Sequence, residues 1–129
     1  MNILFLMALT ALTVTSLPAQ EAPPQILDDA QAIMFSSCLQ NKAHSISECS
    51  CYSKAIKEQM PKTDYHFFME ALYYSNEGDK TGFDKIMKKY NKRVEDLDVM
   101  SKQVTGIGTK VEAECNLDKK ISLPKPKQQ

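Results

Sequence analysis

The sequence predicts an all-α protein, a compact bundle of about five helices that is held by two disulfides and follows a cleaved signal peptide. Three observations lead to this prediction. Apolar residues recur at the three- and four-residue spacing of helices in several segments. No segment alternates convincingly at the two-residue period of a strand. Four cysteines in a small exported chain are most simply two disulfides.

Residues 1–19 have the pattern of a secretory signal peptide. The apolar run from Ile3 to Val14 is shorter than the roughly 20 residues of a membrane-spanning helix. A proline and the small residue Ala19 follow it, as at a signal-peptidase site. No lysine or arginine precedes the run, so a retained membrane anchor is the alternative. Cleavage after Ala19 leaves residues 20–129, with no membrane span and a periplasmic or secreted location.

We expect the exported chain to form one domain. Residues 20–26 form a polar, proline-containing lead-in that we expect to be extended, and residues 27–118 form the helical, disulfide-stapled domain. Residues 119–129 carry lysines and prolines and are expected to be a disordered basic tail. The 16 basic and 16 acidic residues of the chain balance, which removes the electrostatic basis for binding nucleic acid.

Three helices are expected before residue 76, and the second of them has a clear start signal. The first is expected over residues 27–41. The second begins at Ser45, whose spacing from Glu48 predicts a capping box, and ends before Pro61, which lacks an amide proton. The third is expected over residues 64–75, where apolar and aromatic residues repeat at helical spacing.

The fourth helix is expected to be short and the fifth long. Thr81 and Asp84 are the predicted caps of the fourth helix, which continues to Tyr90. An apolar stripe over residues 94–115 predicts the fifth helix. Its two internal glycines, each costing up to about 1 kcal/mol relative to alanine, indicate a kink or a close helix contact. Acidic residues near its start complement the helix dipole, with calcium binding as the alternative: Glu95, Asp96 and Asp98.

Cys49 and Cys51 are expected to bond to different partners. On one helix, residues two apart point about 200° away from each other. Helical wheels place Cys49 and Cys115 within apolar faces, and the other two cysteines at edges. Matching faces with faces and edges with edges favours the pairs Cys38–Cys51 and Cys49–Cys115. The alternative pairing is Cys38–Cys49 with Cys51–Cys115. It stays open because loop entropy does not distinguish the two pairings.

Two reactive roles compete with the structural role of the cysteines. Cys49 and Cys51 could form a redox dithiol near a helix start, but no basic side chain is adjacent and the thiols face apart. Cys38, His44, Cys49 and Cys51 are chemically suited to bind zinc. Their spacing matches no zinc signature, and a zinc site made of these four residues would leave Cys115 without a disulfide partner. We therefore expect no metal and no cofactor.

The sequence contains no recognisable catalytic constellation. His44 and His66 are the only histidines, and the chain lacks a GxSxG elbow, an HExxH pair and a glycine-rich phosphate loop. We expect both histidines to lie on the surface or to be half-buried. Phe67 and Tyr74 fall outside the apolar stripe of the third helix, so one or both could be exposed and form a partner-binding surface.

Several of these features occur together along most of the exported chain. They are Cys38, the pair Cys49-x-Cys51 that opens a helix, the segment TDYHFFMEAL after a proline, and Cys115 near the end. With this pattern the chain resembles a loose group of small exported bacterial all-helical proteins of unknown function. The resemblance implies an all-helical, cysteine-stapled fold and an exported location, and it implies no activity and no site residues.

The function expected from the sequence is that of an exported, non-enzymatic module that binds a protein or assists in the envelope. Its expected partner is another envelope or secreted protein. The alternative is a thiol-redox accessory protein that uses Cys49 and Cys51. A further alternative is a periplasmic immunity or inhibitor protein, because such proteins are often small and helical.

Overall fold

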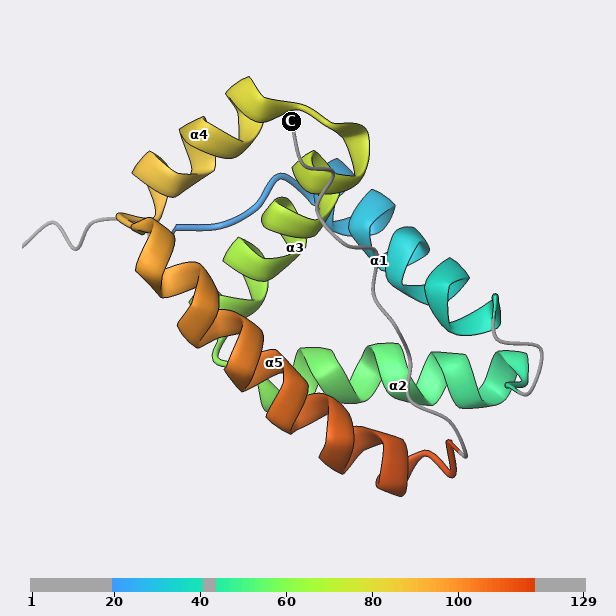
Figure 1. The fold of residues 1–129 in the computed structure, drawn as a ribbon. Helices are drawn as coiled ribbons and strands as arrows, with labels where there is room; N and C mark the ends of the chain where they lie inside the picture. The colour runs from blue at the N-terminus through green and yellow to red at the C-terminus, as the bar shows by residue number, and fades with distance from the viewer. Residues whose placement is uncertain (1–19, 41–43, 118–129) are drawn as a thin grey trace, which may run out of the picture.

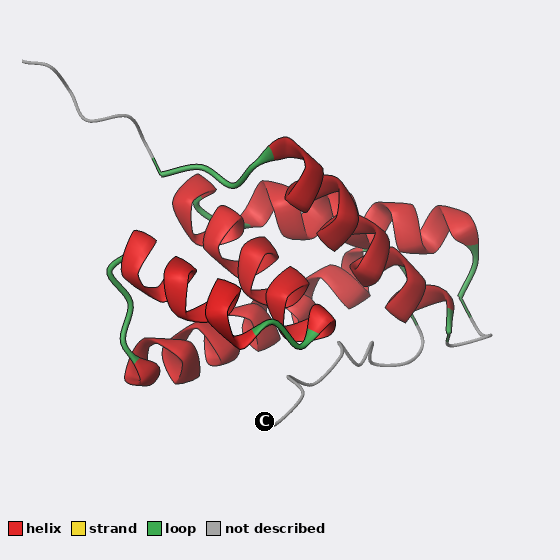
Figure 2. Cartoon of the chain, turned by 90° about the horizontal axis from the view of Figure 1, so that it is seen from above, coloured by secondary structure: helices red, strands yellow, loops and turns green. Residues whose placement is uncertain are grey.

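The computed structural model describes residues 20–40 and 44–117, and within these residues it contains five helices and no strand (Figures 1 and 2). The helices are α1 Pro24–Leu39, α2 Ile46–Gln59, α3 Lys62–Glu77, α4 Lys80–Lys89 and α5 Val94–Glu114. The all-α prediction is therefore confirmed. None of these helices has the length and apolar character of a membrane span. The predicted signal peptide and basic tail lie outside the described residues.

The first helix begins earlier than the sequence predicted. α1 starts at Pro24 rather than at Leu27. Proline is well suited to the first helical position, because its fixed φ matches the helix and an amide there has no intrahelical partner. The extended lead-in is therefore residues 20–23 and not 20–26.

The predicted capping box of α2 is confirmed. The Ser45 side chain accepts a hydrogen bond from the Glu48 backbone N–H at 3.1 Å, and Ser45 N–H donates to Glu48 Oε1 at 3.0 Å. The helix ends at Gln59, and the cap residue Met60 is extended before Pro61. The next helix, α3, begins directly after that proline.

The start of α4 differs from the prediction. Asp79 and not Thr81 is its N-cap, since Asp79 Oδ1 accepts from Gly82 N–H at 2.9 Å. The chain can turn this tightly because Gly78, at the C-terminal end of α3, has a left-handed φ of 68°. Two helices thus meet with almost no loop between them.

At the start of α5, Asp96 forms a capping hydrogen bond. Its Oδ2 atom accepts from Arg93 N–H at 2.7 Å. One of the two glycines lies at a helix contact: Gly108 is buried, and a Cβ atom built on it would make an ordinary van der Waals contact with the Tyr52 hydroxyl, at 3.9 Å. Gly106 faces open space.

The buried side chains form two clusters that meet at α3. The larger cluster joins α1, α2, α3 and α5. The smaller one joins α3 to α4 through Phe67, Ala71, Ile86 and Tyr90. Figure 1 shows α3 between α1 and α4, while α5 crosses α2 and packs against it. Because α3 is covered on two sides, its side chains from Tyr65 to Leu72 are all buried.

Candidate functional site

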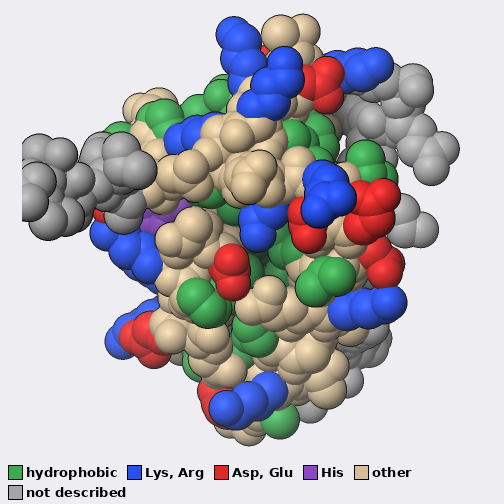
Figure 3. All heavy atoms as spheres, turned by 90° about the vertical axis from the view of Figure 1, so that its left-hand side faces the viewer, with side chains coloured by type: hydrophobic (Ala, Val, Ile, Leu, Met, Phe, Trp, Pro, Cys, Tyr) green, Lys and Arg blue, Asp and Glu red, His purple; other side chains and the backbone are tan. Residues whose placement is uncertain are grey.

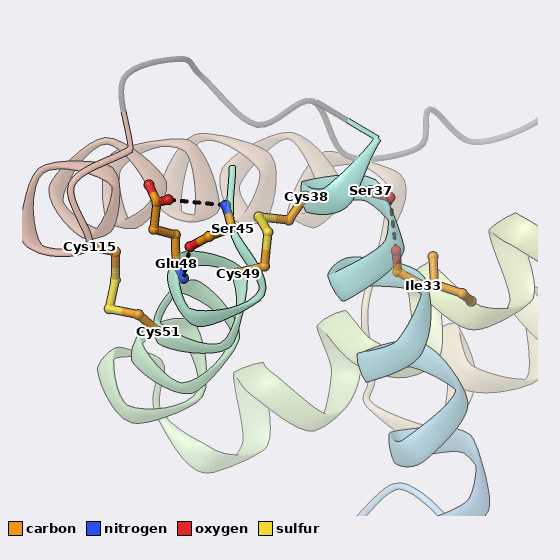
Figure 4. Close-up of a disulfide and its surroundings, with 8 residues drawn as sticks. All are labelled: Ile33, Ser37, Cys38, Ser45, Glu48, Cys49, Cys51 and Cys115. Carbon is orange, nitrogen blue, oxygen red and sulfur yellow. Dashed lines mark hydrogen bonds between the residues drawn. A yellow bond between two sulfur atoms is a disulfide. The ribbon is translucent and has the colours of Figure 1, made fainter. Parts of the chain in front are cut away.

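The cysteines form two disulfides that hold α2 on opposite sides (Figure 4). Cys38 is bonded to Cys49, and Cys51 is bonded to Cys115, each pair with its Cα atoms 5.7 Å apart. Cys49 and Cys51 point away from each other, toward different helices, as the helical spacing predicted. The preferred pairing of Cys38 with Cys51 and Cys49 with Cys115 is wrong, and the alternative pairing is the one that forms.

The packing of α1 explains the wrong pairing. Cys38 was expected at the edge of the α1 stripe, but it is fully buried, in line with Ala30 and Met34. This buried line faces the same core cluster as Cys49. The helix α5 packs along the side of α2 that carries Cys51, whose side chain is exposed.

The cysteines are therefore not arranged as metal ligands or as free thiols. All four are in disulfides. The candidate zinc set of Cys38, His44, Cys49 and Cys51 has its thiols bonded. Within residues 20–40 and 44–117, no group of three or more histidine, cysteine or acidic side chains is placed to hold a metal ion.

The predicted binding surface at Phe67 and Tyr74 does not form as expected. Phe67 is 1% exposed, and its ring packs against the Tyr90 ring with centroids 5.3 Å apart. Tyr74 is half-buried and makes an edge contact with the Tyr73 ring. The prediction is wrong for Phe67 because α4 covers the side of α3 that was expected to be exposed.

Both histidines are buried, contrary to the expectation of surface or half-buried positions. His44, which precedes the cap of α2, is 7% exposed, and neither ring nitrogen has a hydrogen-bond partner within the described residues. His66 is 8% exposed, and its Nδ1 atom accepts a hydrogen bond from Ala22 N–H at 2.8 Å. Because Nδ1 accepts, the proton of the neutral ring lies on Nε2.

A buried carboxylate lies one helical turn after His66. Glu70 is 2% exposed. Its Oε2 atom accepts from the Tyr90 hydroxyl at 2.6 Å and from Lys89 Nζ at 2.9 Å. A buried charge of this kind is tolerated only when it is paired and hydrogen-bonded. Burial, together with the hydrogen bond to Glu70, raises the pKa of the Tyr90 phenol.

The N-terminal segment of the described chain is fastened over this cluster. We call residues 20–23 the strap. The Glu21 carbonyl accepts from Lys89 Nζ at 2.6 Å, and the Glu21 carboxylate pairs with the Lys62 ammonium. Gln20 donates to the Lys89 carbonyl, and the Ala22 side chain is buried. In Figure 1 the strap is the blue segment that runs from near the end of α4 to α1.

Lys62, His66 and Lys89 contact the strap, and the hydrogen-bonded side chains of Glu70 and Tyr90 lie behind Lys89; we call these five residues the strap site. The Lys62 hydrogen bond and charge lower the pKa of the Glu21 carboxyl. Burial lowers the pKa of His66, while the neighbouring Glu21 carboxylate acts in the opposite direction. Figure 3 views the molecule from the left-hand side of Figure 1 and shows basic and acidic side chains interspersed on that face.

The strap site contacts the backbone of the strap at a single peptide unit. Glu21 C=O and Ala22 N–H belong to the same peptide unit, and in a trans peptide these two groups point in opposite directions. Lys89 holds the carbonyl on one side, and His66 holds the N–H on the other. Glu70 does not contact the strap through these hydrogen bonds. Its carboxylate binds the Lys89 ammonium and so positions it.

Sequence reasoning missed the strap site. Its residues join segments 41 to 69 positions apart, and no local pattern connects them. One signal was present: His66 and Glu70 are polar residues spaced i, i+4 within a helix that is otherwise apolar on most sides.

Neither the scan against family models nor the searches of curated proteins and solved structures finds a match for this chain.

Proposed function

We propose that the protein is an exported, non-enzymatic binding module, and that the strap site is where it takes up an extended segment of a partner protein. One observation carries the proposal: His66 and Lys89 hold both polar groups of a single peptide unit. Contacts to the main chain give affinity for extended polypeptide, and side-chain contacts add selectivity. Here the strap occupies the site that a partner segment would take.

The contacts also define the chemistry of a matching segment. Lys62 favours an acidic side chain where the strap has Glu21. The buried position of Ala22 favours a small side chain at the next residue. The preferred partner segment is therefore extended and carries an acidic residue followed by a small one.

The disulfides support an exported location. Bonds of this kind persist in oxidising compartments and are rare in the cytosol. On that basis the partner is another envelope or secreted protein. If that partner is a toxin or a hydrolase, the same binding would amount to the immunity or inhibitor role.

Titration with a peptide tests the proposed site. In the oxidised chain of residues 20–129, Ala22→Arg places a long charged side chain where a buried methyl group lies, which keeps the strap from seating. The ¹⁵N-labelled variant is titrated with an acetylated, amidated hexapeptide of residues 20–25. We expect NMR shifts around His66 and Lys89, with a Kd below about 1 mM, because a strap tethered at a millimolar effective concentration stays seated only if the free segment binds more tightly than that.

Two controls make this titration decisive. The same hexapeptide carrying the Ala22→Arg change should give no shifts at the strap site. The wild-type chain, whose strap is seated, should respond more weakly than the variant. Equal shifts with both peptides, or none at several times the expected Kd, would refute the site.

Cross-linking in the exporting cell tests for a partner. A photo-reactive residue at Thr63, which is exposed beside Lys62, should capture a protein through the strap site. The control adds His66→Ala, which removes one of the two backbone contacts, and should lose that product. A product that persists in the control would place the contact elsewhere.

The second candidate function is the thiol-redox accessory role, and one observation favours it. Cys51 is exposed, whereas Cys38 and Cys49 are fully buried. A redox role would therefore use the Cys51–Cys115 disulfide and not the Cys49 and Cys51 pair. Alkylation and intact mass after mild glutathione treatment separate the two functions: a binding module keeps both disulfides, and a redox protein opens one.

A further inference from the structure

We infer that protonation of His66 releases the strap, so that acidification opens the strap site. The inference concerns the regulation of the site on which the proposed function rests. It is carried by the buried hydrogen bond from Ala22 N–H to His66 Nδ1. An imidazole nitrogen accepts a hydrogen bond only while it lacks a proton, and both ring nitrogens of imidazolium are donors. After protonation of Nδ1, the Ala22 N–H and the His66 Nδ1–H are two donors that face each other with no acceptor between them.

The His66 bond is also the contact that water replaces least easily. Ala22 is 6% exposed and His66 is 8% exposed. The Glu21 contacts are open to solvent, with side-chain exposures of 51% for Glu21 and 68% for Lys62. Exposed ion pairs hold a segment only weakly. Once the buried hydrogen bond is lost, only solvent-exposed contacts hold the strap, and water competes for their donors and acceptors.

The charges around His66 come from the strap, α3 and α4. The titratable groups that face it are Glu21 from the strap, Lys62, Tyr65 and Glu70 from α3, and Lys89 from α4. The two carboxylates favour the imidazolium form, and the two ammonium groups disfavour it. Burial is the largest influence, and it lowers the pKa of His66 from its ordinary value of 6.5.

The sign of the pH dependence follows from this direction. With the strap seated, burial lowers the pKa of His66 below 6.5. Release opens Nδ1 to water and removes the Ala22 N–H that opposes its protonation, so the pKa of the released state is higher. The released state thus binds the proton more readily. The stabilisation of the seated strap is complete above pH 6.5 and is lost as the pH falls toward the lower pKa of the seated state. Across that interval, the ratio of seated to released strap falls by up to about tenfold per pH unit.

Amide exchange of Ala22 measures the release directly. The protection factor of the Ala22 amide is measured by hydrogen–deuterium exchange on the oxidised chain of residues 20–129 from pH 5 to pH 8. The titration of the His66 imidazole is followed in the same samples. We expect the protection of Ala22 to fall with the protonation of His66, while the amide of the buried core residue Met69 stays protected.

Two variants isolate His66 as the cause. In His66→Asn, the amide oxygen lies close to the position of Nδ1 and accepts without titrating, so the protection of Ala22 should not change with pH. His44→Asn changes the other buried histidine and should leave the wild-type dependence intact. Either of two results would overturn the inference: constant protection of Ala22 while His66 titrates, or an equal loss of protection in His66→Asn.

If His66→Asn fails to seat the strap, the wild-type data decide. Release must then share its midpoint with the His66 titration, and separate midpoints overturn the inference. This experiment contains no partner and no peptide. A failure of the hexapeptide to bind would therefore refute the proposed function alone, and a pH-independent strap would refute the release mechanism alone.

Discussion

Opening the Cys51–Cys115 disulfide should destabilise the protein more than the exposure of Cys51 indicates. The two residues are 64 positions apart in the sequence. For a loop of this length, the chain-entropy estimate gives about 4 kcal/mol of stabilisation. A domain of this size has a free energy of unfolding of roughly 5–15 kcal/mol, so the double variant Cys51→Ala/Cys115→Ala should be only marginally folded.

The second disulfide provides the matched control. Cys38 and Cys49 are 11 positions apart, which corresponds to about 3 kcal/mol of chain entropy. Both side chains are fully buried, so Cys38→Ala/Cys49→Ala also loses apolar burial, on the order of 1 kcal/mol for each sulfur. The two double variants should therefore have similar stabilities, for different reasons.

Urea unfolding and amide exchange together distinguish these reasons. Without Cys51–Cys115, exchange should rise first at the C-terminal end of α5, because the disulfide joins that end to α2. Without Cys38–Cys49, exchange should rise at the end of α1 and the start of α2. A loss below 1 kcal/mol for Cys51→Ala/Cys115→Ala, or uniform exchange in both variants, would refute the reasoning.

Four further substitutions test the packing by urea unfolding. Gly106→Ala should raise the free energy of unfolding by about 0.5–1 kcal/mol, because the helical site faces open space; a loss would mean that the site is enclosed. Val111→Ala should cost about 2 kcal/mol because Val111 is fully buried, whereas Val99→Ala, at a residue 64% exposed, should be near neutral; equal costs would contradict the observed orientation of α5. Glu70→Gln should cost about 1–3 kcal/mol, because it leaves Lys89 without a carboxylate partner; an unchanged midpoint would show that the pair contributes nothing.

Helix boundaries could be predicted where one local interaction determines them. Ser45 and Glu48, which form the two reciprocal hydrogen bonds, are three positions apart in the sequence. The start of α2 could therefore be predicted directly from the sequence. The start of α4 could not, because Asp79 and Thr81 are both acceptable caps. The choice between them depends on the left-handed turn at Gly78, which lets α4 begin directly after α3.

The disulfide pairing required information that a helical wheel does not contain. The wheel correctly separates the directions of Cys49 and Cys51 on α2. It does not say which neighbouring helix lies on which side. That depends on how α1 and α5 pack in three dimensions, and α1 packs through the line that ends at Cys38.

The strap site is the part of the molecule furthest from sequence prediction. The residues of the Ala22–His66 bond are 44 positions apart, and those of the Glu21–Lys89 bond are 68 apart. The lead-in also gave no reason to expect docking, because a polar segment with prolines is typical of a solvated terminus. A buried histidine and a buried glutamate on one helix, once located, indicate a polar partner that must come from elsewhere in the chain.

One measurement tests most directly the claim that a peptide unit of the strap is held between His66 and Lys89. A through-hydrogen-bond NMR correlation, recorded at pH 8 on the oxidised, ¹⁵N-labelled chain, reports coupling between the Ala22 amide nitrogen and His66 Nδ1. We predict a cross-peak between these two nitrogens and a His66 ring protonated at Nε2. The absence of coupling, together with an Ala22 amide that exchanges as fast as in an unfolded peptide, would contradict the claim.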